Sequence, residues 1–327
     1  MYLILLQKPI MKFYLMQFLI FFMFILFSAC TTGSKRKIIY TEQELGEALF
    51  FDTILSRDST ISCASCHKPQ FAFADNVAFS KGVYNQKTDR NTPSAMNMAN
   101  RNSYFLDGRA ETLEEQALGP IESKLEMDLP ISLMVRRLIK NERYKSAFLS
   151  IYGTMPTRNL MAQAIASYEK TLETSNSPFD NYMNGSDTTQ FTESAKRGLN
   201  IFNNKGKCFD CHFGSDFTGN DKFKNIGLYN AINLKDEGRF KITHNPKDVG
   251  AFKIPGLRNI AQTAPYMHNG MFKTLKEVIN YYNQPNEFVS NSINRDTLLN
   301  KPLNLSSIEK QDLENFLLSL SDKQFFK

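Results

Sequence analysis

Cys63-Ala64-Ser65-Cys66-His67 and Cys208-Phe209-Asp210-Cys211-His212 are two copies of one pattern, a pair of cysteines followed directly by a histidine. In this pattern the two thiols attach a c-type haem covalently, and the histidine ligates its iron. A zinc ribbon is disfavoured because its cysteine pairs lie roughly 15–20 residues apart, and a thioredoxin-like site needs no histidine. Cysteine and histidine are rare here, five and four of 327 residues, so chance does not account for both copies. The sequence therefore predicts two covalent c-type haems.

A glycine followed by apolar residues at helical spacing precedes each haem motif. The first such stretch is Leu45-Gly46-Glu47-Ala48-Leu49-Phe50-Phe51, and the second is Lys196-Arg197-Gly198-Leu199-Asn200-Ile201-Phe202. Two unrelated amphipathic helices would also show this spacing. The haem motif after each stretch favours a diverged internal repeat instead. We expect each glycine to permit the close approach of a second helix.

Most of the remaining chain has helical rather than strand patterns. Strand signals are few, so the predicted fold class is mainly α, with two cytochrome c-like haem domains. The segment from Thr112 to Glu115 fits a capping box, and Gly119-Pro120 is expected to end that helix. Apolar spacing predicts helices over 41–51, 112–118, 131–140, 143–152, 160–171 and 306–320.

The chain length and one polar segment set the expected domain organisation. About 290 residues remain after the N-terminal segment, which fits two domains or one large domain. The segment 175–189 is polar and contains a proline and a glycine, so it is the expected boundary. We therefore predict an N-terminal haem domain at 41–180 and a C-terminal haem domain at 181–327.

The N-terminal residues have the pattern of a lipoprotein signal peptide. Residues 1–29 carry two lysines and no acid, and 13–27 is an apolar run. Small residues before Cys30 resemble a lipobox, although Phe27 is larger than usual there. A transmembrane anchor is the alternative, but the run is short of the roughly 20 residues needed to span a bilayer. We expect a lipid on Cys30, a tether over 30–40 and a place on the periplasmic side of a bacterial membrane, the outer rather than the inner one.

The number of cysteines and the net charge indicate whether the chain forms disulfides and whether it binds nucleic acid. Four cysteines take haem and Cys30 takes lipid, so none remains for a disulfide. Removal of the signal peptide takes two lysines and no acid from a net charge of +6, which leaves +4. This charge is too small to indicate a nucleic-acid partner.

Three further blocks resemble the bacterial di-haem cytochrome c peroxidase and MauG family. With the two haem motifs, they extend the resemblance over residues 45–320. The resemblance implies that the haem in 41–180 is the peroxide site and that the haem in 181–327 relays electrons. The blocks are Arg90-Asn91-Thr92-Pro93-Ser94, residues 107–121, and Pro255-Gly256-Leu257-Arg258-Asn259 running into 263–270.

The resemblance also assigns site residues. His67 becomes the proximal ligand of the peroxide-site iron, and Gln116, Pro120 and Glu126 become distal-pocket residues. Glu126 would take a proton from one peroxide oxygen and return it to the other, which requires burial to hold its pKa near neutrality.

A calcium site between the haems is implied as well. It would use Asn91, Thr263 and Pro265, through a side-chain oxygen, backbone carbonyls and waters that suit a hard cation.

The sixth ligand of the relay haem departs from the peroxidase pattern. The family position, counted from His268, falls on Tyr282, where peroxidases have methionine and MauG-like members have tyrosine. A tyrosinate lowers the potential of the iron, whereas methionine raises it. Met267 and Met271 are alternative ligands, and Tyr282 could instead pack in the core.

Two further departures concern the peroxide site. No histidine stands between His67 and His212, so we expect this iron to be open in the fully oxidised protein, as in MauG. The chain has no tryptophan, and Leu106 stands where the family has one between the haems. Phe105 and Tyr104 are expected to replace it in part as an electron path. The missing tryptophan weakens the prediction of a MauG-like function.

The predicted function is that of an oxidoreductase of the peroxidase class. It would reduce hydrogen peroxide with electrons from a small periplasmic cytochrome or cupredoxin. A MauG-like oxidase that modifies a partner protein or small molecule is the alternative. A simple electron carrier is a third reading, which the open haem opposite Glu126 disfavours. The sequence leaves open whether the protein is a homodimer.

Overall fold

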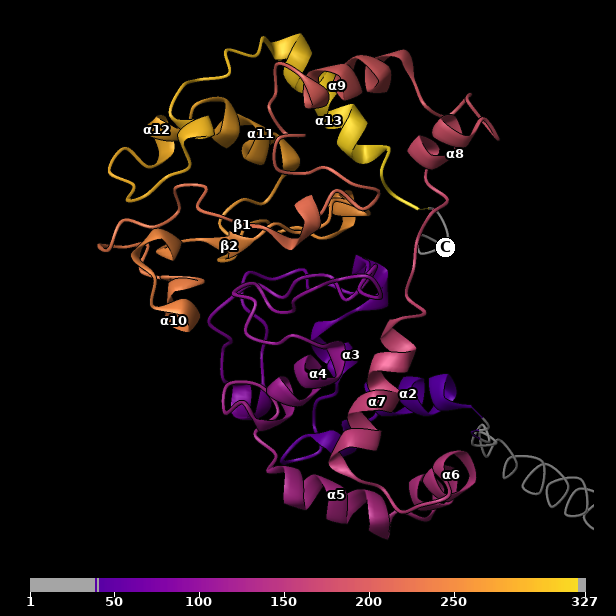
Figure 1. Ribbon diagram of the computed structural model, residues 1–327. Coiled ribbons are helices and arrows are strands. Elements are labelled where there is room, and N and C mark those ends of the chain that lie inside the picture. The colour runs from indigo at the N-terminus through magenta and orange to yellow at the C-terminus, as the bar shows by residue number, and fades with distance from the viewer. Residues whose placement is uncertain (1–38, 40, 323–327) are drawn as a thin grey trace, which may run out of the picture. The chain divides into compact units, whose positions relative to one another are not determined.

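The computed structural model describes residues 39 and 41–322. Residues Tyr40–Lys327 group into one compact unit. The described part is mainly helical, as predicted, and its one sheet is the antiparallel pair β1 (Phe223–Lys224) and β2 (Phe252–Lys253) (Figure 1). The helices are α2 (Glu42–Phe51), α3 (Cys63–Cys66), α4 (Leu113–Glu122), α5 (Ile131–Lys140), α6 (Glu142–Tyr152), α7 (Arg158–Glu169), α8 (Pro178–Asn184), α9 (Glu193–Asn203), α10 (Phe240–Thr243), α11 (Leu275–Asn283), α12 (Pro285–Phe288) and α13 (Ser307–Leu318).

The helix before each haem motif packs against a later helix in the same way. Helix α2 lies on α7, and α9 lies on α13. A Cβ atom at Gly46 would lie 1.9 Å from the carbonyl oxygen of Ala164, and one at Gly198 would lie 2.0 Å from that of Asp312. No side chain fits at either position while the helices stay this close. The glycine-mediated approach expected from the sequence is confirmed, and it supports the internal repeat.

A buried asparagine in each half extends the repeat. The backbone N–H of Asn97 donates to Leu172 O at 2.9 Å, just beyond α7, and that of Asn259 donates to Leu320 O at 3.0 Å, just beyond α13. The two side chains meet at one hydroxyl: Thr174 Oγ1 donates to Asn97 Oδ1 at 2.9 Å and accepts from Asn259 Nδ2 at 3.0 Å. The two haem-binding halves are therefore joined by a buried hydrogen-bond chain.

Helix α4 begins as predicted but ends later. Thr112 caps it by accepting from the Glu115 N–H at 3.1 Å. The Glu115 carboxylate, however, accepts from the Glu111 N–H at 2.9 Å rather than from Thr112, so the reciprocal half of the capping box is absent here. The prediction that Gly119-Pro120 ends the helix was wrong, because α4 continues to Glu122.

Proline is tolerated inside α4 because it removes only one hydrogen bond. Pro120 has no N–H to donate to the Gln116 carbonyl one turn earlier. The next bonds still form, since the Ser123 N–H donates to Gly119 O at 3.0 Å. This places Gln116 and Pro120 on the same face of one helix, four residues apart.

The other predicted helices agree with the structure to within about two residues, as is usual at helix ends. The sequence missed α11 and α8, and α8 lies inside the polar segment expected to be a boundary. Pro178 was taken as a breaker, but it stands in the first turn after the Ser177 cap, where proline is compatible with a helix. The division into domains at 41–180 and 181–327 stays a prediction.

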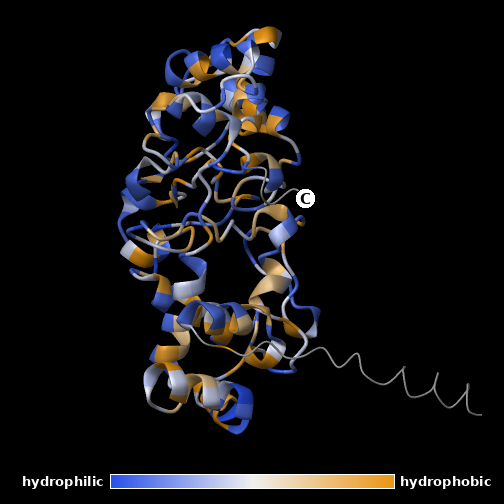
Figure 2. Cartoon of the chain, turned by 90° about the vertical axis from the view of Figure 1, so that its right-hand side faces the viewer, coloured by the Kyte–Doolittle hydropathy of each residue, from blue (hydrophilic) through white to orange (hydrophobic). Residues whose placement is uncertain are grey.

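Aromatic side chains fill the core beside each haem motif. Phe50 is fully buried against Phe73 and Tyr168, with its ring 6.3 Å from that of His67. In the second half Phe316 packs against Phe202 and neighbouring rings. Figure 2 shows hydrophobic and hydrophilic residues interspersed along the helices, as amphipathic packing requires.

Across residues 41–322 the structure contains no helix that is both long and apolar enough to cross a bilayer. The predicted signal peptide at 1–29 and the lipidated Cys30 lie outside the described residues.

Candidate functional site

The first haem motif forms a single helical turn with its histidine at the end. Helix α3 carries both cysteines, and the His67 N–H donates to Cys63 O at 2.8 Å. His67 Nδ1 lies 2.9 Å from Phe73 O. A carbonyl only accepts, so Nδ1 carries the proton and Nε2 keeps its lone pair for a metal. The donor set and its geometry fit a c-type haem.

The second motif repeats this arrangement. The His212 N–H donates to Cys208 O at 2.8 Å, and His212 Nδ1 lies 2.8 Å from Phe217 O. The backbone of Pro255 also hydrogen-bonds to this ring, as the backbone of Pro93 does to His67. The two haem-ligating histidines are therefore held by equivalent backbone partners in the two halves.

Protonation states at the motifs agree with haem rather than zinc. Burial lowers the pKa of both His67 and His212, so the rings are neutral, as iron ligation requires. Burial raises the pKa of Cys66 to about 11, so its thiol is protonated before a cofactor is attached. In the described part of the chain no group of three or more His, Cys, Asp or Glu residues is arranged to hold a metal ion.

Glu126 lies beside the first haem site, on the loop after α4. Its N–H donates to Ser123 O at 3.0 Å, and its carbonyl accepts from the Val83 N–H at 2.8 Å. Burial raises the pKa of its carboxyl, against the opposing effects of Ser123 and Arg109. Burial is the main cause that raises the pKa of Cys63 and of Cys66, and the Glu126 charge adds to it, so this carboxyl lies near the haem-attachment turn.

The loop that carries Glu126 folds back onto α4. The Met127 N–H donates to Pro120 O at 3.1 Å, and the Leu129 N–H donates to Ile121 O at 2.7 Å. A Cβ at Gly82 would lie 2.5 Å from Glu126 O, so this loop is held from the other side as well. Gln116, Pro120 and Glu126 thus belong to one helix–loop unit next to the first haem motif, although their roles stay predictions.

Two adjacent tyrosines on α11 have different environments. The Tyr281 hydroxyl donates to Ile226 O in the core. Burial raises the pKa of Tyr282, and the charges of Tyr281, Cys211 and Cys208 contribute, so its hydroxyl lies near the second haem motif. Met271 is 38% exposed, and Met267 packs against the core of the second half. This arrangement is compatible with ligation by Tyr282, which stays a prediction.

The residues predicted to hold calcium are partly brought together. Asn91 Nδ2 donates to Val77 O at 3.0 Å, which leaves its side-chain oxygen as the candidate ligand. The Asn91 N–H donates to His268 O at 2.7 Å, and this bond places Asn91 beside the segment that contains Thr263 and Pro265. The calcium site stays a prediction.

The three family-like blocks meet around Arg90. Arg90 pairs with Asp107 at 2.6 Å and with Asp236 at 2.6 Å. His268 stacks on Phe252 with ring centroids 4.1 Å apart, and the Arg90 guanidinium lies 5.3 Å from the Phe252 ring. Burial lowers the pKa of His268 to about 4, so the ring is neutral. Phe252 covers one face of this ring. The sequence did not identify this role for His268.

Cations cover both aromatic residues that stand near the family's tryptophan position. The Arg109 guanidinium lies 3.4 Å from the centroid of the Phe105 ring, and Lys253 Nζ lies 5.6 Å from that of Tyr104. The Tyr104 hydroxyl donates to the carbonyls of Met98 at 3.1 Å and Arg101 at 3.3 Å. Sequence patterns could not reveal this cover, because Lys253 lies far along the chain.

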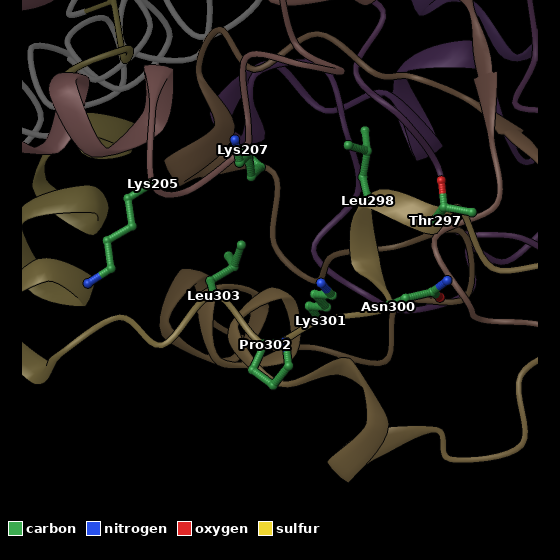
Figure 3. A pocket seen from close by; sticks show the side chains of 8 residues that line it. All are labelled: Lys205, Lys207, Thr297, Leu298, Asn300, Lys301, Pro302 and Leu303. Carbon is green, nitrogen blue, oxygen red and sulfur yellow. The ribbon is translucent and has the colours of Figure 1, made fainter.

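A pocket of about 510 Å³ lies beside the second haem motif (Figure 3). Lys205 and Lys207, which directly precede the motif, line it with Lys301, and Lys205 pairs with Glu309 at 2.7 Å. Phe209 inside the motif is 47% exposed. The attachment turn of the second haem therefore lies close to a basic surface.

Known proteins resemble this chain over most of its length. A family model described as di-haem cytochrome c peroxidase matches residues 41–188. Cytochrome-c peroxidase IdrP1 of Pseudomonas sp. (strain SCT) is 36% identical over 309 residues, covering 85% of this chain and 80% of that protein. Methylamine utilization protein MauG of Methylophilus methylotrophus is 37% identical over 285 residues, covering 84% and 81%. The crystal structure of a MauG-like protein associated with microbial copper homeostasis has a TM-score of 0.75 and 30% identity, covering 88% of this chain and 91% of that one.

Proposed function

Because this chain belongs to the di-haem cytochrome c peroxidase family, we propose that it reduces hydrogen peroxide to water with electrons from a small periplasmic redox protein. The observation that carries the proposal is the half-buried Glu126 carboxyl, which lies near enough to the Cys63–Cys66 turn for its charge to act on both cysteines. A carrier that only shuttles electrons has no use for a proton-transfer group at that place.

Glu126 would move a proton between the two oxygens of the substrate. The haem held by Cys63, Cys66 and His67 supplies the redox chemistry when bound. With its pKa raised by burial, the Glu126 carboxylate can accept a proton from the nearer oxygen and return it to the farther one, which then leaves as water. Gln116 would orient the peroxide through its amide, and Pro120 would shape the pocket wall.

The second haem site would pass electrons to the first. The two electrons that the reaction needs come from the donor, and the two protons come from solvent. We place the donor, a small cytochrome or cupredoxin, on the basic surface formed by Lys205, Lys207 and Lys301, because it adjoins the Cys208 attachment turn. A donor with an acidic face suits this surface.

A MauG-like oxidation of a partner protein is the second candidate, and Tyr282 beside the second haem motif favours it. The cations over Phe105 and Tyr104 count against it. A nearby positive charge raises the energy of an electron hole on an aromatic ring, as the attraction between cations and π electrons implies. Oxidised tyrosine must also release its phenolic proton, but the Tyr104 hydroxyl donates only to backbone carbonyls, which are not bases at neutral pH.

The proposal includes the cellular setting and the calcium ion. Lipid on Cys30 would hold the enzyme on the periplasmic side of a membrane, the outer one in preference, where c-type cytochromes mature. Calcium bound near Asn91, Thr263 and Pro265 would hold the two haem halves in register.

Steady-state peroxide consumption with reduced cytochrome or cupredoxin as donor tests the function. Glu126→Gln should retain both haems and lose turnover by about 100-fold or more, the usual scale for a general acid–base group. Glu122→Gln, at the exposed end of α4, is the matched control and should keep normal turnover. Near-normal turnover in Glu126→Gln would remove the proton-transfer role, and no turnover with any donor would favour the oxidase.

A further inference from the structure

Two basic side chains and one acidic side chain lie buried together where the halves of the chain meet. The side chains of Arg101, Lys253 and Asp221 are only 4%, 8% and 5% exposed. Arg101 Nη2 lies 2.5 Å from Asp221 Oδ1, and Lys253 Nζ lies 4.0 Å from the same oxygen. Asp221 thus lies against both cations, and the charge of Asp216 also acts on Arg101.

Several polar atoms of this cluster have no partner within the described part of the chain. Arg101 Nε and Nη1 have no hydrogen-bond partner, and neither do the Ser103 hydroxyl and Asp221 Oδ1. The remaining donors are used, since Arg101 Nη2 donates to Ile254 O at 3.2 Å and Lys253 Nζ donates to Ser103 O. A buried donor without a partner costs free energy, because the fold does not replace the hydrogen bonds that it made to water. An acceptor on the Nη1 side of the guanidinium would remove this cost.

The cluster stands on the segments that form the wall of the second haem site. Asp221 lies two residues after Gly219, which packs closely against the second haem motif. A Cβ at Gly219 would lie 2.1 Å from Cys211 O and 2.9 Å from the side chain of Ile254. The Ile254 N–H donates to Lys222 O at 2.9 Å, and the next residue, Pro255, is the one whose backbone bonds to the ligand ring. The unpaired Arg101 Nη1 is directed toward this wall, because a Cβ at Gly256 would lie 3.9 Å from it.

We propose that Arg101 and Lys253 form a carboxylate-binding site for a propionate of the haem attached at Cys208 and Cys211. A propionate is a carboxylate that haem itself brings into this wall. One propionate oxygen can accept a charge-assisted hydrogen bond from Arg101 Nη1, while Nη2 stays paired with Asp221.

This site would couple the two halves through the cofactor. Arg101 comes from the N-terminal half and Lys253 from the C-terminal half, so one carboxylate would be held from both sides. Two buried cations near the haem edge also favour the reduced state, because each added electron is stabilised by nearby positive charge. The site would then raise the potential of a haem whose predicted Tyr282 ligand lowers it.

The test is the midpoint potential of each haem in the holoprotein, measured without peroxide so that the result does not depend on turnover. Arg101→Gln should lower the potential of the second haem and leave that of the first unchanged, and Arg101→Lys should restore part of the shift. Lys140→Met is the control, because it removes an exposed positive charge at the end of α5 and should change neither potential. An unchanged potential in fully loaded Arg101→Gln, or equal shifts in both haems, would overturn the assignment.

A second measurement separates a propionate from a dissolved anion and needs no variant. Chloride and phosphate are each titrated into the wild-type holoprotein while the potential of the second haem and the unfolding temperature are recorded at constant ionic strength. A covalently attached propionate predicts no saturable response, because its local concentration is fixed. A saturable decrease in the potential, or a saturable rise in the unfolding temperature, would mean that a free anion occupies the site, and the haem assignment would fail.

Discussion

Gly198→Ala should weaken the protein by forcing α9 away from α13. The new Cβ would lie 2.0 Å from Asp312 O, 2.6 Å from the carbon of that carbonyl and 2.8 Å from the Cβ of Phe316, whereas ordinary contact begins at 3.4 Å. The first two atoms are backbone and the third is fixed to it, so no side-chain rotation relieves the clash. The helices must separate by about 1 Å, the scale at which packed atoms lose a quarter to a half of their attraction.

The expected loss follows from three contributions. Overpacking of a close-packed interface costs about 3 kcal/mol at the upper end of its usual range. Lost contacts around the buried Phe202 and Phe316 add about 1 kcal/mol, while alanine regains about 1 kcal/mol over glycine inside a helix. The net destabilisation is about 3 kcal/mol, which for a unit of this size corresponds to a decrease in Tm of roughly 5 °C.

Circular dichroism at the helix band, together with the haem absorbance, is the suitable assay because the chain has no tryptophan to report by fluorescence. Asn200→Ala, on the exposed face of α9, controls for alanine as a helix former and should change Tm little. Gly46→Ala should behave like Gly198→Ala, since its Cβ would lie 1.9 Å from Ala164 O. A decrease in Tm below about 2 °C for Gly198→Ala would refute the close-approach argument.

Three further outcomes are expected. Replacing Tyr282 by phenylalanine should change the low-spin haem spectrum and raise the potential of the second haem, and methionine should raise it further; an unchanged spectrum would exclude Tyr282 as a ligand. The all-ferric protein should react with peroxide in stopped-flow mixing without pre-reduction, because no histidine stands between His67 and His212 to close the site; a reaction that waits for a donor would contradict this. Burial raises the pKa of Glu169 from 4.5 to about 8, so the folded state binds the extra proton and the free energy of unfolding should fall as pH rises between these values; Glu169→Gln should flatten that slope in pH-dependent urea unfolding, and an unaltered slope would assign it to other groups.

The sequence alone determined the features that depend on neighbouring residues. Two cysteines and a histidine on one turn specify covalent haem attachment, because the spacing brings both thiols and the ring to the same side of α3 and of its counterpart at Cys208. The helix caps at Thr41 and Ser306 were equally local, since each hydroxyl bonds to an N–H three residues later. The repeat was visible for the same reason.

Some sequence predictions failed within single helices, where local signals compete. Pro120 was expected to stop α4, but the loop that returns to it through the Met127 N–H stabilises one more turn. Pro178 was expected to break the chain, but it occupies the first turn of α8. In both cases the outcome depended on which backbone bonds the surroundings supplied, not on proline itself.

Tertiary structure alone decided the electrostatics around the haem sites. Tyr281 and Tyr282 are adjacent and chemically identical, and only packing shows that the first bonds to a core carbonyl while the second lies near the haem motif. The cover of Tyr104 by Lys253 and the pairing of Arg101 with Asp221 join residues more than 100 positions apart. The energies of these contacts depend on burial and on distances of a few ångströms, which exist only once distant segments have packed.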